Sequence, residues 1–378
     1  MGAGAATTSR KQPTKQPQPP SGGGRDAHAL SSNALARLRK GDMQGAIDTC
    51  TEALRLDPEL VEAYCTRGEA RVLSDDLEGA ASDSHEALRR DASAASAFST
   101  RGAVKVRKHD YRGALADLCE SLALDASNAR AWARRGVAKL NLDDFDGAID
   151  DCTRAVTLDP KLAMAWSNRG AAKHSKADYA GTISDCTEAL RLEQNSRTAY
   201  VNRCYARIKL EDFAGALEDT TEELFLAPGS CHLWTRSAAL KLRTGDAEGA
   251  LSDASEAMRI SEPTASALCC RGLAKLDRDD VEGAINDFRQ AIGMDTILRA
   301  SRVGLGKALL RRGDAHEAAG ELQKAMALPE RTSGLVQGLL NGLHKGSVGA
   351  LLAQAQEAQE AKEAKDEEPE AQEPSELG

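Results

Sequence analysis

Seven side chains in the middle of the chain have the chemistry needed to hold a peptide. They are Arg130, Arg134, Asn168, Asn202, Tyr205, His232 and Arg236. Arginine binds carboxylates through paired hydrogen bonds, asparagine bonds to peptide backbone, and tyrosine offers a flat apolar surface. Four of the seven follow one another at steps of 34 residues, beginning at Arg134 and ending at Arg236. This spacing indicates that repeated structural units position them.

A second charged pattern has the same interval. The arginines are Arg67, Arg101, Arg135, Arg169, Arg203 and Arg271, and the acids are Asp83, Asp117, Asp151, Asp185, Asp219, Asp253, Asp287 and Glu321. One interpretation is a positive stripe that binds RNA. The other is internal pairing of each arginine with the acid that follows it in the same unit. The net charge of -9 and the pI near 5.5 argue against a phosphate-binding surface, so internal pairing is favoured.

Side chains that could support catalysis or bind metal are scattered. The seven histidines have no metal-ligand spacing, and no P-loop, HExxH motif or nucleophile elbow is present. The nine cysteines lack a CxxC pair, so we expect reduced thiols in the core. No run of 18 apolar residues exists, so no membrane span is expected. The sequence therefore predicts no enzyme activity, no cofactor and no metal.

The 34-residue period runs without insertion from Ala27 to Thr332 and gives nine units. Counting from Ala27, position 4 is large, positions 8, 10 and 20 are small, and position 16 is aspartate in every unit. Apolar residues recur on one face of two successive helices. The aspartate between them is a typical N-cap for the second helix. A period of this length is typical of stacked helical hairpins, which present an extended surface.

These residues resemble the tetratricopeptide repeat family. The match includes Trp132 at position 4, Gly136 at position 8, Phe145 at position 17, Ala148 at position 20 and Pro160 at position 32 of the fourth unit. The resemblance covers 306 of 378 residues. It implies an all-α, right-handed superhelical solenoid of helix-turn-helix repeats. Position 11 departs from the family pattern because it is basic where the family has an aromatic residue.

In this family the inner groove is lined by positions 2, 5, 6, 9, 12 and 13 of the first helix. The resemblance therefore assigns the seven candidate residues to the groove, where they either bind a partner or form a solvated concave face. Position 12 is apolar nearly throughout, as in Leu38, Leu242 and Leu276. Two interpretations remain open for it: part of the hydrophobic core, or an apolar groove floor.

The resemblance implies a protein-interaction scaffold or adaptor whose partner is another protein with an extended or helical segment, acidic segments included. One alternative is a co-chaperone-type receptor for peptide carboxylates. That clamp needs five residues over three units, and no three consecutive units here supply more than two of them. A second alternative is an RNA-binding helical repeat protein, although nucleic acid is not the expected partner.

The two ends differ in composition from the repeats. Residues 1–26 predict a disordered basic arm rich in Pro, Gly and Gln, and organelle targeting by this arm stays open beside a cytoplasmic location. Residues 333–352 predict a C-terminal capping helix, with self-association through Leu335–Leu343 as the alternative. Residues 353–378 predict a flexible acidic tail that could fold back onto the groove.

Overall fold

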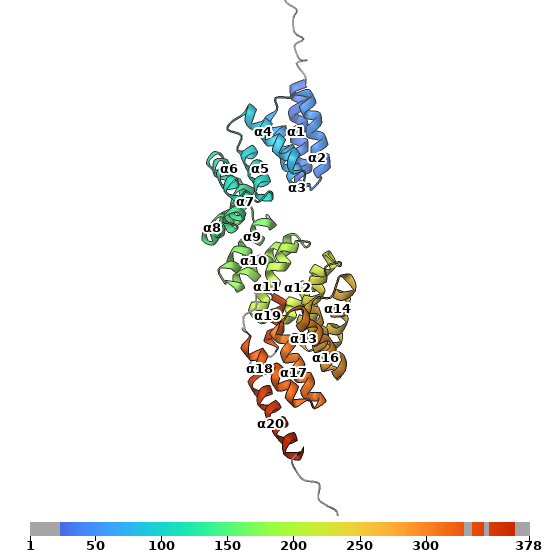
Figure 1. The fold of residues 1–378 in the computed structure, drawn as a ribbon. Coiled ribbons are helices and arrows are strands. Elements are labelled where there is room, and N and C mark those ends of the chain that lie inside the picture. The colour runs from blue at the N-terminus through green and yellow to red at the C-terminus, as the bar shows by residue number, and fades with distance from the viewer. Residues whose placement is uncertain (1–22, 329–334, 344–347, 367–378) are drawn as a thin grey trace, which may run out of the picture. The chain divides into compact units, whose positions relative to one another are not determined.

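The computed structural model describes residues 23–328, 335–343 and 348–366. Every regular element in these ranges is an α-helix (Figure 1). The chain divides into two compact units, residues 1–168 and 169–378, and α9 (Ala163–Ser175) contains the division. Residues 1–22 of the predicted basic arm lie outside the described residues, whereas residues 23–26 belong to α1.

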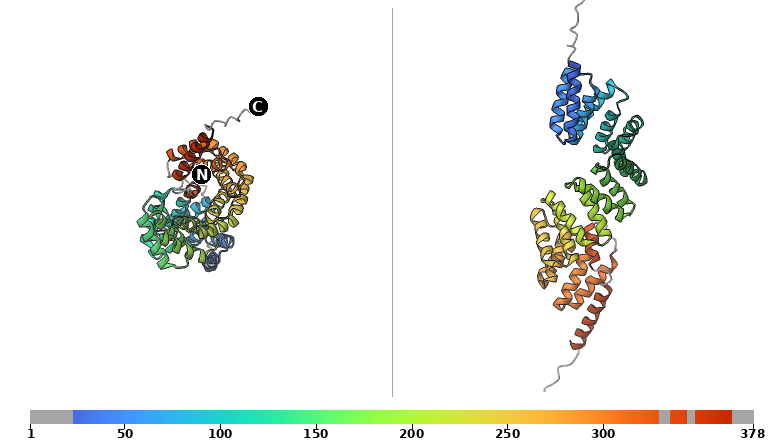
Figure 2. Two further views of the ribbon diagram at one scale, coloured as in Figure 1. Left: turned by 90° about the horizontal axis from the view of Figure 1, so that it is seen from below. Right: turned by 180° about the vertical axis from the view of Figure 1, so that it is seen from behind.

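The bounds of the helices follow the period. The helices of unit 1 before α9 are α1 (Gly23–Arg39), α2 (Met43–Leu56), α3 (Val61–Leu73), α4 (Leu77–Arg90), α5 (Ala95–Arg107), α6 (Tyr111–Leu124), α7 (Ala129–Leu140) and α8 (Phe145–Leu158). Those of unit 2 after α9 are α10 (Tyr179–Leu192), α11 (Arg197–Lys209), α12 (Phe213–Leu226), α13 (Cys231–Thr244), α14 (Ala247–Ile260), α15 (Ala265–Asp277), α16 (Val281–Met294), α17 (Arg299–Arg312), α18 (Ala315–Ala327), α19 (Leu335–Gly342) and α20 (Val348–Asp366). Within each unit the helices stack as hairpins in chain order, which both views of Figure 2 show.

The aspartate at position 16 begins the second helix of each hairpin. In eight repeats its side chain accepts a hydrogen bond from the backbone N of a glycine three residues later; for Asp144 and Gly147 the distance is 3.0 Å. A Cβ at that glycine would collide with the carboxylate, which explains the recurring pair of Asp and Gly. Asp314 is the exception and makes no side-chain cap. The predicted capping role is confirmed in the other eight repeats.

Small residues at position 8 let the two helices of a hairpin approach closely. A Cβ added to Gly136 would collide with Cys152, and one added to Gly272 would collide with the fully buried Phe288. Position 12 takes part in the core, because Leu38, Leu242 and Leu276 are at most 8% exposed. The apolar side chain at this position therefore packs between repeats, in place of the aromatic residue that position 11 lacks.

The residue just before each capping aspartate has a left-handed backbone. Gly41, Gly245 and Gly313 occupy this position in three repeats. In the other six it is a residue with a side chain: Asp75, His109, Asp143, Ala177, Glu211 or Asp279, with φ between 61° and 68°. Only glycine adopts this conformation without steric cost. Six of the nine turns are therefore strained, a feature that the sequence pattern did not reveal.

The C-terminal segment differs from the single capping helix predicted over residues 333–352. Two helices form, and α20 covers the last hairpin by packing against α17 and α18, with Val348 and Ala355 buried. Helix α19 packs instead against α13, α15 and α17. The predicted flexible tail includes residues 353–366 of α20, and its remainder, 367–378, lies outside the described residues.

Candidate functional site

The repeated arginines and acids form ion pairs inside each hairpin. In the fourth repeat Arg135 Nε donates to Asp151 Oδ2 over 2.7 Å, and Lys139 Nζ lies 3.0 Å from the same oxygen. The Asp151 side chain is only 4% exposed. Equivalent pairs are Arg67–Asp83, Arg101–Asp117, Arg169–Asp185, Arg203–Asp219 and Arg271–Asp287. The predicted internal pairing is confirmed, and these charges stabilise hairpins.

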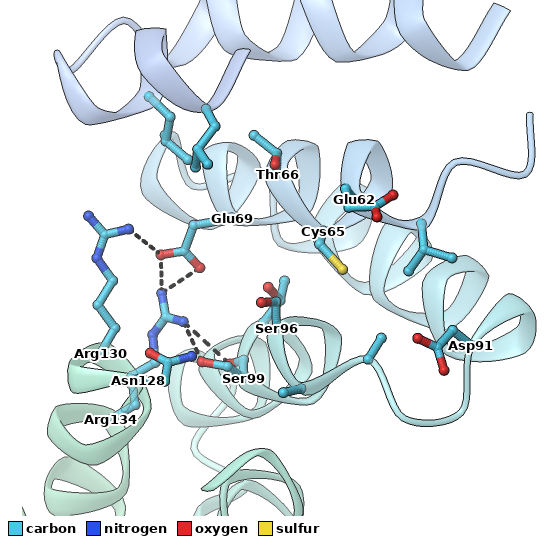
Figure 3. Close-up of a pocket in the computed structure, with 16 residues that line it drawn as sticks. Glu62, Cys65, Thr66, Glu69, Asp91, Ser96, Ser99, Asn128, Arg130 and Arg134 are labelled. Carbon is cyan, nitrogen blue, oxygen red and sulfur yellow. Dashed lines mark hydrogen bonds and ion pairs between the residues drawn. The ribbon is translucent and has the colours of Figure 1, made fainter. Parts of the chain in front are cut away.

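Unit 1 contains a groove of about 440 Å³ between the first helices of four repeats (Figure 3). Helix α1 contributes Leu35 and Leu38, α3 contributes Val61, Glu62, Cys65, Thr66 and Glu69, α5 contributes Ala95, Ser96, Ser99 and Thr100, and α7 contributes Arg130 and Arg134. Asp91, Ala94 and Asn128 lie in the turns that precede α5 and α7. The groove therefore uses the inner positions that the resemblance implies.

Two of the predicted groove arginines meet at one glutamate. Arg134 Nη2 donates to both carboxylate oxygens of Glu69, over 2.6 and 2.8 Å, and Arg130 Nη1 donates over 3.3 Å. Arg134 Nη1 also donates to Ser99 Oγ over 3.0 Å. Burial alone would raise the pKa of Glu69, but the charges of Arg134 and Arg130 outweigh it and hold that pKa below its usual range. Glu69 is therefore an ionised, buried acid that fixes both guanidinium groups.

The groove has opposite charges at its two ends. Arg134 is 7% exposed and neutralised by Glu69, whereas the Arg130 side chain is 43% exposed at the same end. Glu62 and Asp91 lie at the other end, with Cys65 between (Figure 3). Burial, with a contribution from Glu62, raises the pKa of the Cys65 thiol to about 12. The thiol stays protonated at neutral pH and serves as wall rather than nucleophile.

The other predicted site residues are distributed along α9, α11 and α13. In unit 2, Arg236 is buried and pairs with Glu223, and its guanidinium lies 5.8 Å from the centre of the Tyr205 ring. Asn202 lies on α11 near Tyr205, and His232 is exposed on α13. Asn168 is the last residue of unit 1, on α9. The structure thus brings together Arg130 with Arg134, and Tyr205 with Arg236.

Comparison with known families decides the assignment of the repeats. Residues 129–162 and 271–332 each match a family model described as tetratricopeptide repeat. The first match is the α7–α8 hairpin, and the second covers most of α15 together with α16, α17 and α18. The chain is a tetratricopeptide repeat protein. Proteins of this family act as scaffolds for protein interactions, and this chain is one of them.

Solved tetratricopeptide repeat structures are also similar in part. A tetratricopeptide repeat protein from Parabacteroides merdae is 18% identical, with a TM-score of 0.37, over 75% of this chain and 99% of its own. The protein TTC0263 from Thermus thermophilus is 14% identical, with a TM-score of 0.41, over 48% of this chain and 99% of its own. A structure of pilF from Pseudomonas aeruginosa is 16% identical, with a TM-score of 0.45, over 55% and 95%. No curated protein matches the chain.

The carboxylate clamp known in tetratricopeptide repeats is altered here by an acid. Arg134 stands at a clamp position, position 6, but position 9 of the second repeat is Glu69 where the clamp has asparagine. Because Glu69 already binds both arginines, the chain supplies its own carboxylate at that point. The sequence showed Glu69 at a clamp position but not its contact with Arg134, since the two residues are 65 positions apart.

Neither a metal site nor a membrane helix is found in the described part of the chain. No three His, Cys, Asp or Glu side chains there are placed to hold a metal ion. None of the described helices is both long and apolar enough to cross a membrane. The residues missed at the sequence stage are Glu62 and Asp91 of the groove and Glu223 beside Arg236. Their signal was weak because each is one acid among 58.

Proposed function

We propose that this tetratricopeptide repeat scaffold binds a partner protein through an extended segment laid along the concave positions. The seven predicted residues, Arg130, Arg134, Asn168, Asn202, Tyr205, His232 and Arg236, remain the proposed contact set. The observation that carries the proposal is the groove of unit 1, with a volume of about 440 Å³ and walls from four first helices. The volume is within the usual range of binding pockets.

The chemistry of the groove indicates the kind of segment that would fit. An acidic side chain of the partner would reach Arg130, the exposed cation, and a basic one would lie beside Glu62 and Asp91. Small apolar side chains would contact Leu35, which is 39% exposed, and the protonated Cys65. The proposed partner segment therefore has both charges with an apolar residue between them.

The alternatives are less well supported. Glu69 at the clamp position argues against a co-chaperone-type receptor for free carboxylates, because a second carboxylate would meet the first. The pairing of Arg135 and Lys139 with Asp151 argues against an RNA-binding stripe. The cytoplasmic location stays a prediction.

A blocking substitution tests the groove. Peptides would be selected from a random display library with the full chain as bait, then titrated against variants. Ser96→Trp fills the groove at an exposed wall residue that makes no ion pair, and Glu120→Trp places the same side chain on exposed α6 outside the lining. We expect at least tenfold weaker binding for Ser96→Trp and no change for Glu120→Trp. Equal affinities for both variants would move the site elsewhere.

A further inference from the structure

The concave surface of unit 2 is covered by a segment of the chain itself. Helix α19 (Leu335–Gly342) packs against α13, α15 and α17, the first helices of the last three repeats. Figure 1 shows α19 beside α13, well before the chain reaches α20. This is the helix-in-groove arrangement that repeat proteins use for partner peptides, made here within one chain.

The groove beneath α19 is apolar, unlike the groove of unit 1. The inner positions of α13, α15 and α17 include Ala239, Leu242, Cys269, Leu273, Leu276 and Val303, each at most 8% exposed. Leu339 and Leu340 of α19 belong to the same buried cluster. In unit 1 comparable positions carry Glu69, Ser99 and Arg134. The change from polar to apolar along the concave surface explains why the leucine-rich segment lies here.

Helix α19 matches this groove in pattern and in charge. Its apolar residues Leu335, Val336, Leu339 and Leu340, followed by Leu343, are spaced for one helix face, and the helix contains no charged residue. At its C-terminal end Gly342 lies against the guanidinium of Arg243, which also stacks 4.1 Å above the Phe213 ring. A cation at a helix C-terminus is favourable because the carbonyls there carry partial negative charge.

Little besides this apolar face holds α19 in place. The helix has eight residues, and helices this short are marginal without tertiary contacts. Gly338 lies within it on the exposed side, where a Cβ would meet nothing within 4 Å, so the glycine weakens the helix without serving the packing. Gln337 Nε2 donates to Asp295 Oδ2 over 3.1 Å as a polar anchor.

We propose that α19 is a displaceable internal ligand, and that the groove of α13, α15 and α17 receives from a partner protein a short amphipathic helix with the same leucine spacing and an uncharged or acidic C-terminal end. A tethered segment acts at millimolar local concentration, so the partner must compete with it. The surface is distinct from the groove of unit 1, so failure of this proposal leaves the proposed function of that groove untouched.

The test is a titration of the full chain with a fluorescent peptide of residues 335–343. Leu339→Asp with Leu340→Asp should release α19 and tighten peptide binding about tenfold or more. Gly338→Ala should hold α19 more firmly and weaken peptide binding up to about fivefold, the ratio that corresponds to the helix propensity difference. Ala353→Asp with Gln354→Asp, which adds the same charges to the exposed face of α20, should change nothing. Equal affinities in all four proteins would overturn the proposal.

Two further readouts remove the remaining ambiguities. If the double leucine variant does not fold, hydrogen exchange on the unmodified chain replaces it: excess peptide should speed amide exchange in residues 335–342 while α16 and α18 stay unchanged. Unaltered exchange in α19 at saturating peptide would contradict displacement. Light scattering distinguishes the occupant. A dimer of the unmodified chain that disappears in the double leucine variant would assign the groove to a second copy and overturn the partner assignment.

Discussion

At the scale of single residues, buried acids hold the cations that a repeat pattern alone would offer to a ligand. Asp151 carries two cations inside one hairpin, and Glu69 carries two across three repeats. The first arrangement could be predicted, because both partners recur at a fixed interval. The second could not, because Glu69 and Arg134 appear in single repeats and meet only after the repeats stack.

Replacing Asp151 tests the repeated pair. Asp151→Asn leaves Arg135 and Lys139, both largely buried, without their acid, and we expect a loss of about 2 kcal/mol in unfolding free energy. The neighbouring Asp150→Asn is the matched control, because Asp150 is exposed. Urea denaturation of the two variants gives the comparison. Similar curves for both would mean that the ion pair contributes nothing to the hairpin.

The Glu69 pair predicts a pH dependence. Because the pKa of Glu69 is lower in the folded protein than in the unfolded chain, its stabilisation is complete above about pH 4.5 and is lost as the pH falls toward the folded value. Glu69→Gln should cost at least about 2 kcal/mol at pH 7 by leaving Arg134 buried without an acid. The difference from the unmodified chain should shrink between pH 4.5 and pH 3. A difference that stays constant over that range would rule out the ionised pair.

At the scale of elements, each hairpin follows from its own sequence, whereas the connection between its helices carries a hidden cost. The aspartate cap and the small residues at position 8 were readable because they recur. The left-handed residue before the cap was not, since glycine occupies it in only three of nine repeats. The placement of α19 was missed for a different reason: a leucine stripe does not say which apolar surface it covers.

Relieving one strained turn should stabilise the protein. Ala177 has φ 61°, so Ala177→Gly removes a steric cost of about 1 kcal/mol and should raise the melting temperature. Ala171→Gly inside α9 makes the same chemical change in regular helix and should lower stability by about 0.5–1 kcal/mol. Opposite signs for the two variants are the expected result of thermal unfolding. A decrease for both would show that the turn is not strained.

At the scale of the whole molecule, the two units differ in how their cores are built. Unit 2 has one continuous buried cluster that includes Phe288, Leu298 and Leu340. The described buried clusters in unit 1 are smaller and separate, such as that of Ala114 and Leu118. Because repeat proteins derive stability from contacts between neighbours, unit 1 should open first. Hydrogen exchange in rising denaturant should show exchange in α3–α6 before α14–α17; the reverse order would contradict this ranking.

The central claim is that a partner segment lies in the groove of unit 1, and hydrogen exchange of the full chain with a bound display-selected peptide tests it most directly. The account predicts slower exchange in α3, α5 and α7, whose side chains line the groove around Arg130 and Glu62. Helices α4, α6 and α8, the second helices of the same hairpins, should exchange as in the free protein. Protection confined to α4, α6 and α8 would place the partner outside the groove and contradict the claim.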